Sequence, residues 1–200
     1  MSRAMVACIL ALLPATEVVA GERKTHVGLH AGVVLPQVSS ELKTALGIKL
    51  EAGFRAWSKL APFVQVGYSQ PVVESAQPDQ RLPAGSYSST TVQRELSVTA
   101  GALWWFRDPS SSWNIYAGVG ARMYLLQTIT NGEAGESSFL ENRETSTRYG
   151  AMAAAGLELA VGPGTVVGEL EGSGSDLPHL ITGDVATTAA AVSVGYRLFF

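Results

Sequence analysis

The sequence predicts an all-β protein, an eight-stranded antiparallel up-and-down β-barrel that crosses a membrane. Three observations support this prediction. Apolar and polar residues alternate with period two in eight segments, short and long connections alternate between these segments, and one face of the segments is charged whereas the other is apolar. The eight segments cover residues 25–35, 44–56, 63–70, 92–106, 113–128, 147–161, 165–172 and 185–200.

The alternation is clearest in residues 113–125. Every odd position there is apolar, from Trp113 to Leu125, and every even position is polar, glycine or tyrosine. Side chains on a strand point alternately to opposite faces, so such a segment has one apolar face and one polar face. Residues 192–200 repeat the pattern, whereas residues 165–172 are the least regular of the eight segments.

The composition excludes several classes of protein. The chain has 200 residues, 14 Lys and Arg against 17 Asp and Glu, and 16% charged residues, compared with about 25% in ordinary soluble domains. A chain this apolar is not a disordered polyampholyte. The net charge of -3 provides no basic patch, so nucleic acid is not an expected partner. The length suits one domain.

Residues 1–20 predict a secretory signal peptide, and residues 21–200 predict a single barrel domain. Arg3 is followed by the short apolar stretch 4–13, and small residues precede a cleavage position before Gly21. Cys8, the only cysteine, lies in the signal peptide, so we expect no disulfide and no thiolate metal site in the mature chain.

The connections between the segments predict the two ends of the barrel. The connections at residues 57–62, 107–112 and 162–164 are short, and we expect tight turns there. The alternate connections at 36–43, 71–91, 129–146 and 173–184 are mostly longer and rich in Ser, Thr, Gln, Glu, Gly and Pro, which is typical of solvated loops. An up-and-down barrel therefore has turns at one end and loops at the other.

The charged residues decide which face is inside. A soluble barrel has its apolar face inside, whereas a membrane barrel has its apolar face outside. The apolar set contains large side chains such as Phe54, Trp104 and Trp113, for which an eight-stranded lumen has little room. With this set facing lipid, the charged residues lie inside, where they can pair. The predicted interior charge network consists of Lys49, Glu51, Arg55, Glu95, Arg122, Arg148, Glu158, Glu169, Glu171 and Arg197.

Aromatic residues of outward parity gather at both ends of the predicted strands. Such bands are typical of the two interfaces of a membrane barrel. The residues beside the short turns or the C-terminus are Trp57, Trp104, Phe106, Trp113 and Phe200, and those near the long connections are Tyr68 and Tyr149.

With these features the chain resembles the small eight-stranded outer-membrane β-barrels of Gram-negative bacteria, the family that includes the OmpA transmembrane domain and OmpX. The resemblance covers residues 24–200. It implies localisation in the outer membrane, and contact with its lipid and lipopolysaccharide. It also implies that the C-terminal pattern is a signal for the barrel-assembly machinery. The residues of this pattern are Val192, Val194, Tyr196, Leu198 and Phe200.

No catalytic, cofactor or metal site is predicted. His26 and His30 are four residues apart on one strand, about 13 Å, which is too far to share a metal ion. Ser, His and Asp residues of the last long connection lack a G-x-S-x-G motif. The sequence therefore predicts a monomeric, non-catalytic barrel with a charge-plugged interior and a role in envelope integrity or in recognition through its loops. The alternatives are a narrow ion or solute channel and, third, a lipid-modifying enzyme.

Overall fold

The computed structural model describes residues 25–36, 43–78, 86–108, 111–134, 137–175 and 188–200. Neighbouring strands pair antiparallel throughout this part of the chain. The predicted signal peptide lies outside it. Within it, no helix is long and apolar enough to span a membrane. The strands are β1 (Thr25–Pro36), β2 (Ala45–Phe54), β3 (Leu60–Ser69), β4 (Val72–Pro78), β5 (Ser86–Trp105), β6 (Trp113–Ala134), β7 (Ser137–Val161), β8 (Gly164–Ser175) and β9 (Ala189–Phe199).

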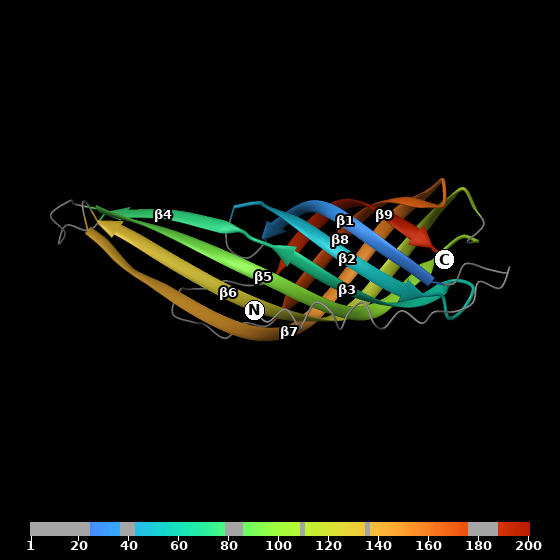
Figure 1. Ribbon diagram of the computed structural model, residues 1–200, viewed down its shortest axis with the longest axis horizontal. Helices are drawn as coiled ribbons and strands as arrows, with labels where there is room; N and C mark the ends of the chain where they lie inside the picture. Colours follow the sequence, from blue (N-terminus) through green and yellow to red (C-terminus); the bar gives the residue numbers. More distant parts are fainter. Residues whose placement is uncertain (1–24, 37–42, 79–85, 109–110, 135–136, 176–187) are drawn as a thin grey trace.

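A single sheet closes on itself (Figure 1). Strands adjacent in the chain pair with each other except β3 and β4, β9 pairs with β1, and β3 pairs with β5. β4 continues the path of β3 beyond Pro71 and pairs with the first part of β5. Proline has no N–H to donate to a ladder, which accounts for the interruption. β3 and β4 therefore occupy one strand position in the barrel, and the predicted eight-stranded up-and-down barrel is confirmed.

The outer wall of the barrel is apolar. Mid-strand side chains of outward parity are well exposed, for example Leu29 at 62%, Val119 at 63% and Val194 at 63%. Their chain neighbours point inward and are buried, as the alternating burial along β1, β3 and β8 shows. The predicted assignment of inward and outward side chains is therefore correct along these strands. An exposed apolar wall of this kind is stable only when lipid or another apolar phase covers it.

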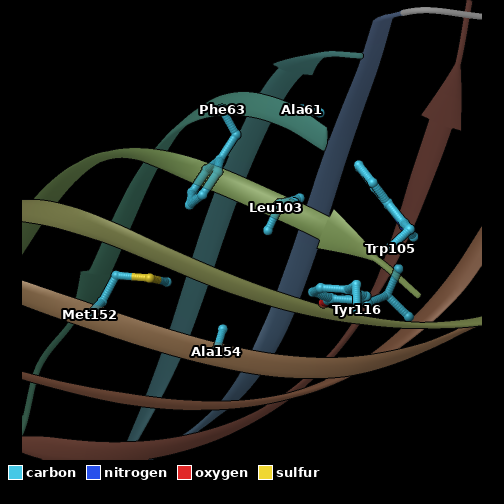
Figure 2. Packing of buried hydrophobic residues seen from close by; sticks show 8 residues of the cluster. Ala61, Phe63, Leu103, Trp105, Tyr116, Met152 and Ala154 are labelled. Carbon is cyan, nitrogen blue, oxygen red and sulfur yellow. The ribbon is translucent and has the colours of Figure 1, made fainter. Parts of the chain in front are cut away.

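The lumen also contains an apolar cluster that the sequence analysis did not expect. Phe63, Leu103, Trp105, Tyr116 and Met152 point inward from β3, β5, β6 and β7 (Figure 2). All five are at most 4% exposed. The interior is therefore packed by aromatic and aliphatic side chains as well as by charged ones.

Three strands extend well beyond the barrel. β5, β6 and β7 have 20, 22 and 25 residues, whereas a tilted strand needs about 9–11 to cross a bilayer. Their extensions stay paired with one another and with β4, and they form the structure at the left of Figure 1. We call this the projecting sheet; it consists of β4 and residues 86–93, 127–134 and 137–145.

The projecting sheet corrects a prediction. Residues 71–91 and 129–146 were expected to be solvated loops, but most of them form strands. Both faces of these segments carry mainly polar residues, so the period-two pattern is lost although the backbone ladder continues. Cross-strand polar pairs support it, such as Thr91 with Thr130, whose hydroxyls are 3.1 Å apart. The expected loops at 36–43 and 173–184 lie mostly outside the described residues.

The opposite end has the predicted short turns. Val161 and Gly164 are joined by two residues, and Gly162 has a φ of 59°, a left-handed conformation that glycine adopts without a steric penalty. The C-terminus lies at this end too, because Phe200 exchanges backbone hydrogen bonds with Thr25.

Candidate functional site

The inward faces of β1, β2 and β5–β9 place charged and polar side chains in the lumen. Here they form two clusters, one near the short turns and one near the middle of the strands. Because ionised groups are costly to bury without partners, the pairing of each group decides whether the interior is sealed or reactive.

The turn-end cluster consists of Arg197, Glu51, Glu158 and His26. The guanidinium of Arg197 is fully buried; its Nε and Nη2 lie 2.8 Å and 2.7 Å from Glu51 Oε1, and its Nη1 donates to Glu158. His26 Nε2 lies 3.0 Å from the same Glu51 oxygen. One arginine therefore joins two carboxylates from β2 and β7.

A glycine lies between the two partners of this contact. Gly28 of β1 lies between Glu51 of β2 and Arg197 of β9 in the register of the sheet. A Cβ at Gly28 would lie 3.0 Å from His30 Nε2 and 3.7 Å from Glu51 Oε1. A side chain at this position would crowd the His30 ring and approach the Glu51 carboxylate.

Aromatic rings complete the turn-end cluster. Trp105 Nε1 donates to Glu158 Oε2 at 2.9 Å. The guanidinium of Arg55 lies 5.3 Å from the Trp105 ring and 5.6 Å from the Phe199 ring, within the range of a cation–π contact. Arg55 thus supplies a second positive charge, beside the aromatic rings of this cluster.

The mid-strand cluster consists of Lys49, Arg122, Glu169 and Glu171. Lys49 pairs with Glu169 and lies 3.0 Å from Glu171, which also pairs with Arg122. Two cations therefore balance two carboxylates. Arg122 is further held by Thr99 Oγ1 at 2.7 Å and Gln65 Oε1 at 3.1 Å.

Tyr116 connects the two clusters. Its hydroxyl donates to Glu169 Oε2 at 2.6 Å, and its ring lies 5.0 Å from the guanidinium of Arg197. Tyr116 is fully buried. The lumen therefore contains one continuous network of ion pairs, hydrogen bonds and ring contacts.

The structure brings eight of the ten predicted interior residues into this network. Glu95 and Arg148 lie on the inward faces of β5 and β7, but neither forms an ion pair with another described residue. Tyr124 and Leu126, on β6 between these strands, lie opposite Arg148 and Glu95 respectively. The intervening strand and its bulky side chains keep the two charges apart.

The sequence analysis missed the residues that hold the ions in place. Trp105, Tyr116, Gln65 and Thr99 all have inward parity, so the strand pattern places them in the lumen. Which carboxylate or cation each contacts depends on the stagger of the strands around the barrel, which the pattern does not give.

The charged groups of the two clusters are paired with one another. The carboxylates of both clusters are engaged by cations, and among the described residues no group of three His, Cys, Asp or Glu could hold a metal ion. A cavity of about 500 Å³ at the turn end is lined by Arg55, Trp105, Glu158, Thr165 and Phe199, among others. Glu158, which lines this cavity, pairs with Arg197.

A closed antiparallel barrel with eight strand positions, an apolar outer wall and a charged interior defines the fold of the small outer-membrane β-barrels. The chain is similar to Neisserial surface protein A (NspA), with a TM-score of 0.55 and 18% identity over 88% of this chain and 97% of that chain. It is also similar to a major outer membrane protein from Thermus thermophilus, with a TM-score of 0.53 and 11% identity over 88% of this chain and 99% of that chain. The resemblance predicted from the sequence is thus confirmed for the fold.

No protein-family model matches the chain, and no curated protein sequence matches it.

Proposed function

We propose that this protein is a bacterial outer-membrane β-barrel that acts as a sealed, non-catalytic anchor for the projecting sheet. The observation that carries the proposal is the contrast between the two faces of the wall: apolar side chains outside, and a balanced network of ion pairs inside. Lipid suits the first face, and the second fills the lumen that a channel would need open.

The barrel would hold the projecting sheet outside the membrane. In barrels of this class the short turns face the periplasm and the longer connections face outward. The sheet then stands above the outer leaflet, next to lipopolysaccharide, with strands β4 to β7 rigidly continued from the barrel. This supports a role in envelope integrity or in recognition at the cell surface.

Assembly would use the C-terminal strand. Val192, Val194, Leu198 and Phe200 are 49%, 63%, 37% and 60% exposed on the outer face. An apolar stripe that ends at the C-terminus is the pattern that the barrel-assembly machinery reads in the family this chain resembles. We propose that the protein is exported after signal-peptide cleavage, inserted by this route and monomeric.

Fractionation with protease accessibility tests the proposal. The full chain, expressed in Gram-negative cells, should appear in the outer-membrane fraction. Trypsin added to intact cells should cleave at Arg143 in the projecting sheet, whereas Arg122 and Arg197 in the lumen should resist. Recovery in the soluble periplasmic fraction, or turnover of labelled lipopolysaccharide by the purified protein, would contradict the proposal.

A further inference from the structure

The turn-end rim of the outer wall carries two cations among exposed aromatic rings. Lys59 lies in the turn between β2 and β3, and Arg107 lies in the turn between β5 and β6. The side chains around them are Trp57, Trp104, Phe106 and Trp113, which are 65%, 48%, 57% and 39% exposed.

Both cations are held in fixed places. The guanidinium of Arg107 lies 3.9 Å from the centroid of the Trp113 ring. Lys59 Nζ donates to the carbonyl of Phe106 at 3.3 Å, so it lies at the peptide group that joins Phe106 to Arg107. Both cations are therefore anchored at the end of β5, next to Phe106.

A buried asparagine fixes the turn itself. Asn114, 4% exposed, accepts a hydrogen bond from the Arg107 backbone N–H at 3.0 Å and donates to the Arg107 and Asp108 carbonyls at 3.2 Å and 3.3 Å. The backbone that carries Arg107 is thus set before any ligand binds, which reduces the entropy cost of binding.

Neither cation is neutralised by a described residue. Lys43, Lys49, Arg122 and Arg197 all form ion pairs, whereas Lys59 and Arg107 form none within the described ranges. The adjacent acid, Asp108, lines the cavity at the barrel mouth, and so does Trp113, on which Arg107 stacks. The two cations are therefore available to an anionic ligand at this rim.

We propose that Lys59 and Arg107 bind the phosphate of an anionic phospholipid in the inner leaflet of the outer membrane. This inference rests on the proposed function, which places the rim at the level of the inner-leaflet headgroups. Guanidinium and ammonium groups donate hydrogen bonds to phosphate oxygens, and exposed Trp and Phe rings suit the region between headgroup and acyl chain. The neighbouring rings contact the glycerol and upper acyl chains of the same lipid.

The tryptophans provide a built-in probe. All four tryptophans of the chain lie at this rim, three outward and Trp105 buried in the lumen. The protein is folded into phosphatidylcholine vesicles that contain a small fraction of either brominated phosphatidylglycerol or brominated phosphatidylcholine. Bromine quenches tryptophan, so the ratio of quenching reports selective binding of the anionic lipid.

We expect wild type to prefer phosphatidylglycerol by about fivefold or more, since one cation at an anionic headgroup contributes about that factor. The double variant Lys59→Gln and Arg107→Gln should lose this preference, and high salt should weaken it in wild type. The matched control is Lys43→Gln with Arg94→Gln, which removes the same charge at the other end of the barrel. It should behave as wild type.

Two outcomes separate the two proposals. If wild type does not insert into vesicles, as judged by heat-modified gel mobility, the proposed function fails and this inference fails with it. If wild type inserts but both brominated lipids quench equally, or if the double variant folds and keeps the preference, the lipid site alone is overturned. Should the double variant not fold, a preference in wild type that does not respond to salt overturns the site.

Discussion

The hydroxyl of Tyr116 donates a 2.6 Å hydrogen bond to Glu169 while its ring lies against Arg197. A single buried side chain thus joins the two ion clusters of the lumen. Hydrogen bonds to charged groups contribute about 1.5–3 kcal/mol.

Removing this hydroxyl should weaken the network. We expect Tyr116→Phe to lower the free energy of unfolding by about 1.5–3 kcal/mol, measured by urea titration in lipid vesicles. Tyr196→Phe is the control, because the Tyr196 hydroxyl is near the surface and donates to the Val161 carbonyl at 2.7 Å. A loss no greater for Tyr116 than for Tyr196 would show that the hydroxyl does not support the network.

Glu158 should be far more sensitive than an exposed carboxylate. Glu158→Gln leaves Arg197 with a weakened partner in the lumen and should cost about 3–5 kcal/mol, less to the extent that water reaches the site. Glu74→Gln, in an exposed pair with Lys43, should cost at most about 1 kcal/mol. Both are measured by unfolding titrations. Similar losses for the two variants would refute a dry, coupled interior.

The two histidines of β1 should differ in effect. His26 contacts Glu51, whereas neither ring nitrogen of the fully buried His30 has a hydrogen-bond partner among the described residues. His26→Leu should therefore destabilise by about 1–3 kcal/mol, whereas His30→Leu removes an unpaired polar group and should be neutral or stabilising. The same unfolding assay applies. A larger loss for His30 than for His26 would mean that His30 has an essential partner.

The free-energy cost of a charge on the outer wall should depend on its depth in the membrane. Val119, mid-strand on β6, is 63% exposed, and Val119→Arg should cost about 2–4 kcal/mol. Leu46 lies near the start of β2, at the end of the barrel opposite the short turns. Leu46→Arg places the same charge there and should cost about 0–1 kcal/mol. Equal costs in vesicles would argue against a lipid-facing wall.

The sequence predicted the barrel because successive side chains on a strand face lipid and lumen in turn. Lipid favours apolar side chains, whereas the lumen accommodates polar and charged ones. Val119 and Arg122 could be assigned to the outside and the inside from parity alone. The projecting sheet was not predicted, since its segments carry mainly polar residues on both faces and no alternation marks them, as at Thr91 and Thr130. Parity likewise placed Tyr116 inward but could not pair it with Glu169, because that contact depends on how the strands are staggered around the ring.

Conductance tests the central claim most directly. The purified protein is inserted into a planar bilayer and the current is recorded under an applied voltage. Because the paired charges and the packed rings fill the lumen, we expect no sustained current from wild type. Steady ion-selective currents that change on substitution of Arg122 or Glu158 would contradict the sealed interior and identify the protein as a channel.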